Sequence, residues 1–434
     1  MQKRENPAFF TLRIYKLIVI LIIENSKTIN KMKIKTTDII EETKKVFGKY
    51  FSGNEISGFL KKINSSRKPS EVTSQKPSDG LFSSQLRLEI DQIISFAEKK
   101  LPTLNFLDLL KDLGKLYIAH GELDLASDIT TTILSYTKKD KRLVGIAAYA
   151  FLNFGEIYIH QTMWAESHFY IKKASSFFKK GNDAVGLARC ESLLGTLYAE
   201  KGQLSDAIAH FQKGFSYLDP SRDTSVAALI ENNMGIIHNI RGDYDSAYTY
   251  FRRALIHFEG LKDTQRVAKI RHNLGMLFLK KKEFNSAIKE FDTSISVSLS
   301  SHYYTTLAIS YTSKASIYCT LNDDALANAF ANQGMDISYK IKDKLTIAEV
   351  YKIKGILERK KKHFEIAQNY FVSSLRLNEE LENELNYAET AVELGILFYE
   401  TKKSDQAKSY FNEALKYYKK IKANDEIERI KYFL

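Results

Sequence analysis

Residues that could catalyse a reaction or hold a metal ion are few and scattered in this chain of 434 residues. The nine histidines show neither HExxH nor HxH spacing, and the two cysteines, Cys190 and Cys319, form no CxxC pair. The sequence also lacks a GxxxxGK(S/T) loop, a strand followed by GxGxxG and a GxSxG elbow. We therefore predict that the protein is not an enzyme and has no catalytic residue, metal site or cofactor. The cysteines lie in apolar stretches, which predicts buried free thiols.

The amino-acid composition indicates a helical protein with a substantial core. Proline is scarce, at 5 residues, and 44% of the residues are hydrophobic; such a composition favours helices. The net charge of +12 is uneven, because residues 1–63 carry 13 Lys and Arg against 6 Asp and Glu while the rest is nearly balanced. A nucleic-acid-binding body needs basic residues over its working surface, so we expect no nucleic-acid partner.

One small residue recurs through most of the chain at a nearly constant interval. The interval is 41 residues once and then 40 residues six times. The eight positions are Gly114, Gly155, Gly195, Gly235, Gly275, Ala315, Gly355 and Gly395. Other residues follow in register, as Phe278, Ala287 and Phe291 follow Gly275.

Each unit has the pattern of two helices joined by a short polar turn. A mid-helix glycine costs about 1 kcal/mol relative to alanine, which is tolerated where a second helix must approach closely. The alanine of the second helix permits close packing, and the phenylalanine fills the adjoining space. One such hairpin cannot bury its apolar face alone, so the repeat predicts an all-α protein, an α-solenoid of about eight stacked hairpins.

This pattern resembles the tetratricopeptide repeat, W-x2-L-G-x2-Y…A-x3-F. The best copies are LLGTLYAEKGQLSDAIAHFQKG at residues 193–214 and NMGIIHNIRGDYDSAYTYFRRA at residues 233–254. The interval of about 40 residues exceeds the usual 34, and the usual proline between units is missing. Longer repeats of this kind are similar to those of kinesin light chain, the polarity adaptor LGN and the Rap-type bacterial peptide receptors. The resemblance implies a right-handed superhelix whose first helices line a concave groove.

The resemblance also implies which side chains reach a ligand. They lie six, three and two positions before the recurring small residue, and one, four and five positions after it. The candidate peptide-binding residues are Asn153, Arg189, Ser192, Asn232, Asn233, Asn239, Lys269, His272, Asn273, Lys280, Lys352 and Arg359. Asparagine two positions before the glycine offers a donor and an acceptor to a peptide backbone. The alternative is that these amides hydrogen-bond within the stack.

The charged candidates indicate the chemistry of the partner. Arg189, Lys269 and Lys280 would suit an acidic group or a C-terminal carboxylate. The later repeats combine Lys352 and Arg359 with several glutamates. We therefore expect a peptide or protein segment that carries separated charges of both signs.

The first 31 residues are basic and apolar, with IYKLIVILII at residues 14–23. This run is shorter than the about 20 residues of a spanning helix, and no small-residue cleavage site follows it. Three interpretations remain open: an over-extended translation start with Met32 as the initiator, a short membrane-interacting or export segment, and a helix packed on the body. We expect a cytoplasmic protein, with an exported, periplasmic or membrane-tethered location as the alternative if the second interpretation holds.

The remaining chain divides into three parts. Residues 32–63 predict a short helical segment, the Ser/Pro/Lys-rich residues 64–85 a flexible linker, and residues 86–434 the solenoid. We expect a non-catalytic interaction scaffold that binds a peptide or protein segment in the concave groove. The alternative is a bacterial signalling or transcription regulator in which the repeats sense a peptide and the segment before Gly80 is the output module.

Overall fold

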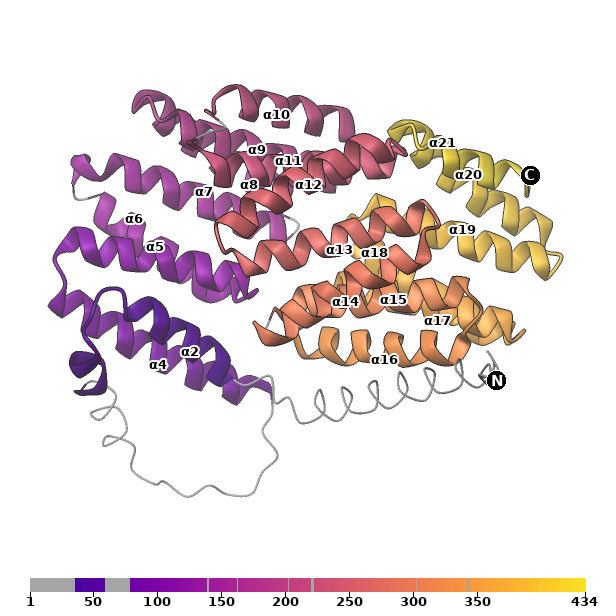
Figure 1. Cartoon of the computed structure of the whole chain (residues 1–434), viewed down its shortest axis with the longest axis horizontal. Coiled ribbons are helices and arrows are strands. Elements are labelled where there is room, and N and C mark those ends of the chain that lie inside the picture. Colours follow the sequence, from indigo (N-terminus) through magenta and orange to yellow (C-terminus); the bar gives the residue numbers. More distant parts are fainter. Residues whose placement is uncertain are drawn as a thin grey trace, which may run out of the picture. The chain divides into compact units, whose positions relative to one another are not determined.

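The computed structural model describes residues 36–58, 79–138, 140–161, 163–201, 203–219, 222–301, 303–341 and 343–434, and these residues form helices and turns without a β-strand (Figure 1). The chain divides into two compact units, here called the N-terminal unit (Ile34–Leu193) and the C-terminal unit (Leu194–Leu434). None of the described helices has the length and hydropathy needed to cross a membrane. The apolar run at residues 14–23 lies outside the described residues.

The N-terminal unit contains two helices followed by two hairpins. Its helices are α2 (Thr36–Phe47), α4 (Asp79–Lys100), α5 (Thr103–Ala119), α6 (Leu123–Thr137), α7 (Val144–His160) and α8 (Trp164–Lys180), with a short 3₁₀ turn at η1 (Lys141–Leu143). Residues 79–85, which the sequence assigns to the linker, form the first turns of α4. Phe47 and Phe51 lie buried in one apolar cluster with Ile90 and Ile93 of α4. Segment 36–51 is therefore packed into the unit rather than separate from it.

The C-terminal unit is built from consecutive hairpins. The boundary between the units falls within α9 (Ala184–Glu200), which pairs in sequence with α10 (Leu204–Ser216). The helices that follow are α11 (Thr224–Arg241), α12 (Tyr244–Gly260), α13 (Thr264–Lys280), α14 (Phe284–Ser300), α15 (Tyr304–Thr320), α16 (Asp324–Ile341), α17 (Lys344–Lys360), α18 (Phe364–Glu380), α19 (Glu384–Glu400), α20 (Ser404–Ile421) and α21 (Asn424–Lys431). The predicted all-α solenoid of helical hairpins is confirmed, with one hairpin for each recurring small residue.

The recurring glycine receives the phenylalanine of its own hairpin. A Cβ atom added at Gly275 would lie 2.6 Å from Cε1 of Phe291, which is too close for any real side chain. The same contact recurs at Gly195, Gly235, Gly355 and Gly395, each against the phenylalanine sixteen positions later. The glycine is thus required by ring packing against its backbone, and the predicted small–large pair is confirmed.

The turns inside most of the hairpins share one backbone conformation. Seven positions after the recurring small residue, the chain adopts positive φ at Gly121, Gly242, Lys282, Asn322 and Lys362. Such a left-handed residue ends a helix and reverses the chain within three residues. The turns between units use the same conformation at Asn182, Lys262 and Glu382, where the usual proline is missing.

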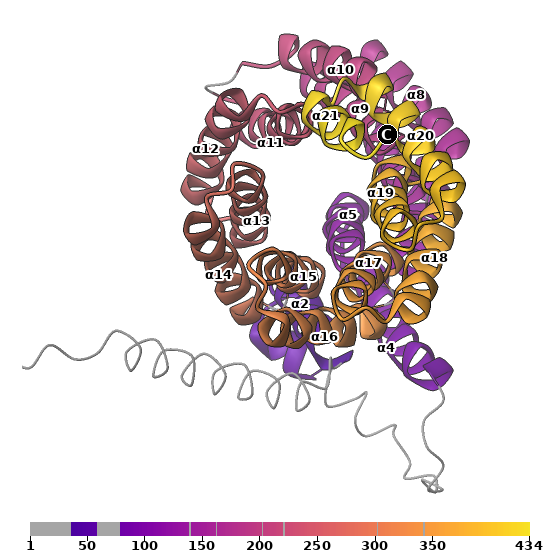
Figure 2. The same ribbon diagram turned by 90° about the vertical axis from the view of Figure 1, so that its right-hand side faces the viewer.

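In the C-terminal unit the two helices of each hairpin lie on opposite sides of the curve. Figure 2 shows α11, α13, α15, α17 and α19 on the inner side, with α12, α14, α16 and α18 outside them. The first helices of the hairpins therefore line the concave face of this unit, as the resemblance implies.

Candidate ligand-binding surface of the C-terminal unit

A chain of side-chain hydrogen bonds crosses three successive inner helices. Asn273 Nδ2 of α13 donates to Asn232 Oδ1 of α11 at 2.8 Å, and Asn232 Nδ2 donates to Asn233 Oδ1 at 3.3 Å. Asn233 Nδ2 in turn donates to Thr196 Oγ1 of α9 at 3.2 Å. We call these four residues the asparagine ladder. The ladder joins three of the predicted asparagines. These amides therefore hydrogen-bond within the stack, which is the alternative stated for them in the sequence analysis.

The ladder leaves part of its hydrogen-bonding capacity open toward a ligand. Asn232 is buried and uses both ends of its amide within the ladder. Asn273 is only half-buried, and its Oδ1 accepts no hydrogen bond from the described residues. An amide has two donor hydrogens and two acceptor lone pairs. The ladder thus fixes the orientation of the Asn273 amide while its carbonyl oxygen remains available.

His272 lies beside the ladder in a buried polar cluster. Its Nδ1 is 3.2 Å from Ser310 Oγ, which is 3.0 Å from Ser294 Oγ, and Ser294 donates to the backbone oxygen of Ala268 at 2.8 Å. Burial and, to a smaller extent, the positive charge of Lys269 together lower the pKa of His272 to about 3. His272 is therefore a neutral imidazole at ordinary pH, whereas Lys269 itself is exposed.

The later inner helices carry paired charges. Lys352 of α17 is buried and bonds Glu349 at 2.7 Å and Glu389 of α19 at 2.5 Å. Burial alone would lower the pKa of Lys352, but these two carboxylates raise it above its ordinary value. Lys352 is thus held as a cation against Glu389, whose pKa its charge lowers, whereas burial raises the pKa of Glu349. A ligand group that reaches Lys352 meets a charge already satisfied by the protein.

Arg359 occupies a second such cluster. Its guanidinium contacts Glu393 at 3.0 Å and Glu400 at 2.6 Å, and Glu393 also contacts Arg429 of α21 at 2.7 Å. The predicted combination of Lys352 and Arg359 with glutamates is therefore present as direct ion pairs between neighbouring helices.

Two further candidates lie where the inner helices end. Lys280, the last residue of α13, contacts Glu426 of α21 at 2.9 Å. Asn239 lies near the end of α11 and lines a small hollow shared with Lys280 and the start of α21. The acidic residues of α21 were not predicted from sequence, because no local pattern reports a contact between residues 146 positions apart.

Three of the sequence candidates belong to the N-terminal unit. Asn153 of α7 is buried, and its Nδ2 has no hydrogen-bond partner among the described residues. It lies beside Gly114, where an added Cβ would be 3.6 Å from that nitrogen. Arg189 is half-buried and Ser192 is buried, both in the first part of α9. The other nine candidates lie in the C-terminal unit.

Thr196 is the ladder residue that the sequence reasoning missed. It lies one position after Gly195, which is a position that the resemblance implies for ligand contact. The repeat register was therefore sufficient to identify it.

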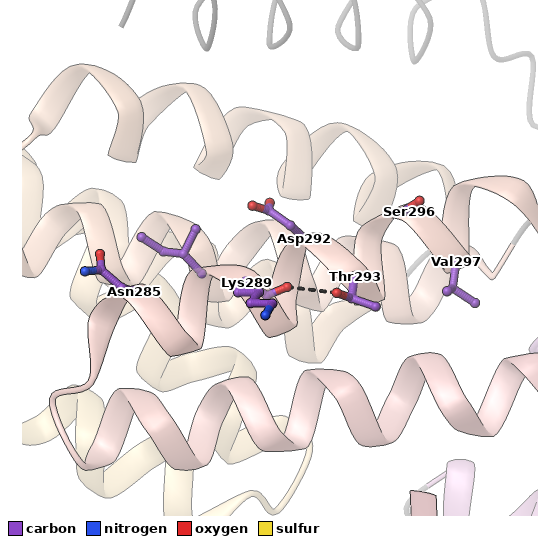
Figure 3. Close-up of a pocket in the computed structure, with 7 residues that line it drawn as sticks. Asn285, Lys289, Asp292, Thr293, Ser296 and Val297 are labelled. Atoms are coloured by element: carbon purple, nitrogen blue, oxygen red, sulfur yellow. Dashed lines mark hydrogen bonds between the residues drawn. The ribbon is translucent and has the colours of Figure 1, made fainter. Parts of the chain in front are cut away.

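The outer face of the solenoid offers a contrast to the inner face. A shallow open hollow runs along α14, and the residues that line it all come from that helix (Figure 3). They are Asn285, Ile288, Lys289, Asp292, Thr293, Ser296 and Val297. The one bond drawn there, from Thr293 Oγ1 to the backbone oxygen of Lys289 at 2.9 Å, lies within the same helix. No second element contributes a converging group, so this hollow is a weaker candidate.

The two cysteines are free and buried, as predicted. Within the described part of the chain, no group of three or more His, Cys, Asp or Glu residues is placed to hold a metal ion.

The comparisons with known proteins concern the repeats and the fold. Residues 226–300 and 346–420 match the family model of the tetratricopeptide repeat, and no curated protein sequence matches the chain significantly. A Rap protein complexed with competence and sporulation factor is similar with a TM-score of 0.58 at 14% identity, over 78% of this chain and 93% of that one. The Rap conjugation gene regulator of the plasmid pLS20, in complex with the Phr* peptide, gives 0.56 at 18% identity, over 81% and 92%.

Identities this low show similarity of fold alone. The chain thus contains tetratricopeptide repeats at residues 226–300 and 346–420, and its helical solenoid is similar in fold to these Rap structures.

Proposed function

We propose that the concave face of the C-terminal unit binds an extended peptide or protein segment, and that it does so without catalysing a reaction. The observation that carries this proposal is the asparagine ladder, which places ordered amide groups on the inner helices α11 and α13 and bonds them to a hydroxyl group on α9. A row of amides can bond the alternating donors and acceptors of a peptide backbone whatever its side chains are.

The ladder supplies preorganisation. A free asparagine side chain would have to be immobilised when the ligand binds, and that loss of freedom weakens binding. Asn273 is already held by its bond to Asn232, so its Oδ1 can accept a backbone N–H of the ligand at little further cost in side-chain entropy. In this proposal Asn273 contacts the ligand, and the buried Asn232 positions it.

Charges beside the ladder would give selectivity. Lys269 is exposed six positions before Gly275, and His272 near it is neutral. An acidic group of the ligand would therefore pair with the Lys269 ammonium, while the neutral His272 adds no second positive charge. The ion-paired Lys352 and Arg359 would accept a ligand only by exchanging one protein carboxylate for a carboxylate of the ligand.

The similar solved structures support a peptide as the ligand. One of those Rap proteins is bound to competence and sporulation factor and the other to the Phr* peptide. This support is an analogy of fold, and the asparagine ladder is the support that comes from the residues of this chain.

The proposal is tested with a library of random linear peptides displayed on phage and selected against the full chain. Selected peptides should bind the wild type and should bind the Asn233→Ala/Asn273→Ala double variant at least about tenfold more weakly, which corresponds to roughly 1.4 kcal/mol. Asn285→Ala removes an exposed asparagine from the outer face of α14 and serves as the matched control, with unchanged affinity expected. Equal binding by a folded double variant would reject the proposal.

A second candidate function is a peptide-responsive regulator whose output involves the segment before Gly80. The observation that favours it is the packing of α2 and the turn after it against α5 within the N-terminal unit: Thr43 Oγ1 lies 3.0 Å from Tyr117 Oη in a buried position, and Lys49 contacts Asp112 at 3.1 Å. Hydrogen exchange of α2, with and without a selected peptide, tests this candidate. A change in its exchange would support the regulator, and no change would favour the plain scaffold.

A further inference from the structure

The last helix of the chain returns to the first hairpins of the C-terminal unit. Asp425, in the first turn of α21, accepts a hydrogen bond from Tyr244 Oη of α12 at 3.0 Å. Its neighbour Glu426 contacts Lys280 Nζ of α13 at 2.9 Å. These contacts join residues that are 181 and 146 positions apart in sequence. In Figure 2, α21 lies close to α11 at the point where the curve of this unit meets itself.

The other end of α21 is attached to the last hairpin. Arg429 contacts Glu393 of α19 at 2.7 Å, and Ile430 is fully buried. The helix is therefore anchored on one side by a fully buried apolar residue and an ion pair, and on the other side by a hydrogen bond and a partly exposed ion pair. This asymmetry means that the contact to Tyr244 and Lys280 can break while α21 stays attached to α19 and α20.

The contact with the first hairpins is imperfectly packed. A hollow of about 20 Å³, which is room for about one water molecule, lies between the α11–α12 turn and the start of α21. Asn239 Oδ1 and Arg241 Nε lie buried beside it, and neither has a hydrogen-bond partner among the described residues. A water molecule in the hollow can bond these atoms, so this contact is polar and less tightly packed than a protein interior.

Charge is what favours closure. Burial alone would lower the pKa of Lys280, but the negative charges of Glu389 and Glu426 raise it above its ordinary value. The side chains of Lys280 and Glu426 remain 36% and 22% exposed, so salt can screen their attraction. Ion pairs at such positions contribute little individually, which makes the closed state only slightly preferred.

We propose that the first turn of α21 is an electrostatic clasp, which reversibly closes the concave face of the C-terminal unit by holding Tyr244 and Lys280. Opening the clasp separates the last hairpin from the first ones and widens access to the inner helices. It also releases the Lys280 ammonium from Glu426 toward an acidic group of a ligand. That last consequence rests on the proposed function, whereas the opening itself does not.

The clasp is tested by the distance between spin labels at Arg252 on α12 and Glu428 on α21, both of which are exposed. The native cysteines are buried and free, so they should not compete for label. At low salt the full chain should show one narrow distribution of short distances between the two labels. Raising the salt to about 1 M, where the screening length falls to roughly 3 Å, should populate a longer distance.

Charge reversal isolates the ion pair. Lys280→Glu should lower the ratio of closed to open population by roughly fivefold at low salt. The Lys280→Glu/Glu426→Lys double variant should regain part of it. Lys281→Glu is the matched control, since Lys281 pairs only locally with Glu283 at 3.0 Å, and it should behave as the wild type.

Three outcomes would overturn the clasp. They are a single short distance that persists in Lys280→Glu and in high salt, a broad distance already present in the wild type at low salt, and an equal effect of Lys281→Glu. Because no ligand is needed, a failed clasp leaves the proposed function untouched, and failure of the peptide selection leaves the clasp testable.

Discussion

The backbone of Gly275 lies against the ring of Phe291, so close that an added Cβ would sit 2.6 Å from Cε1. The hairpin built on Ala315 shows the complementary solution, because Ala331 stands where five of the other hairpins have phenylalanine. A larger residue on the first helix is thus accompanied by a smaller one on the second. The pair, rather than the glycine alone, sets the spacing within a hairpin.

We predict that Gly275→Ala destabilises the C-terminal unit although alanine is the better helix former. Overpacking costs about 1–3 kcal/mol, whereas the gain in helix propensity is about 1 kcal/mol. Phe291→Ala should cost about 3–5 kcal/mol, and the double variant should lose less than the sum of the two. Denaturation midpoints measure these changes.

Gly260→Ala is the control for this prediction. Gly260 is the last residue of α12, and an added Cβ there would meet nothing within 4 Å. Its replacement should be neutral or stabilising. A stabilising Gly275→Ala, or strictly additive losses in the double variant, would contradict the pairing of Gly275 with Phe291.

The left-handed turn residue offers a stabilising substitution. Lys282 has φ of 61°, where a side chain costs about 1 kcal/mol or more and glycine does not. Lys282→Gly should therefore raise the thermal midpoint. Lys281→Gly, at the preceding right-handed position with φ of −72°, should leave it unchanged or lower it. Equal effects of the two substitutions would show that the turn is not strained at Lys282.

The buried histidine makes stability depend on pH. The pKa of His272 is lowered to about 3 from an ordinary value of 6.5, so below pH 6.5 the unfolded chain binds a proton that the folded chain does not. Stability should therefore fall as pH drops from about 6.5 toward 3, by up to roughly 1.4 kcal/mol per pH unit from this group.

His272→Gln should flatten that fall, while His363→Gln on an exposed turn should not. Denaturation at several pH values between 7 and 4 compares the three proteins. A wild-type curve with the same slope as His272→Gln would show that His272 is protonated in the folded chain.

Asn232 should affect ligand affinity without touching the ligand. Asn232→Ala removes the acceptor that holds Asn273 Nδ2 at 2.8 Å, so the Asn273 amide becomes free to rotate. We expect weaker binding of a selected peptide and a loss of about 1–3 kcal/mol in stability. Anisotropy titrations and denaturation give the two values. A loss of stability with unchanged affinity would mean that the ladder is structural only.

The sequence predicted the repeated hairpins because their signal is local and repeats: a small residue, a turn and a phenylalanine must recur for consecutive hairpins to stack. It also placed Asn232, Asn233 and Asn273 on one inner face. It did not show that these amides bond one another, because a bond such as Asn273–Asn232 depends on how two neighbouring hairpins are aligned.

Contacts between parts of the chain that are distant in sequence could not be predicted either. Glu426 meets Lys280 only because the curvature of the intervening hairpins brings the last helix back to the first ones. That curvature is the sum of small rotations between units, which no single motif encodes. Ion pairs such as Lys352–Glu389 follow the repeat spacing more closely, and the sequence did group these residues.

The central claim is that a peptide lies along the inner helices of the C-terminal unit, and hydrogen exchange of the full chain with a selected peptide tests it most directly. We predict slower exchange in α11 and α13, where the asparagine ladder lies, with little change in α12 and α14. Slower exchange confined to the outer helices, such as α12 and α14, would contradict the claim.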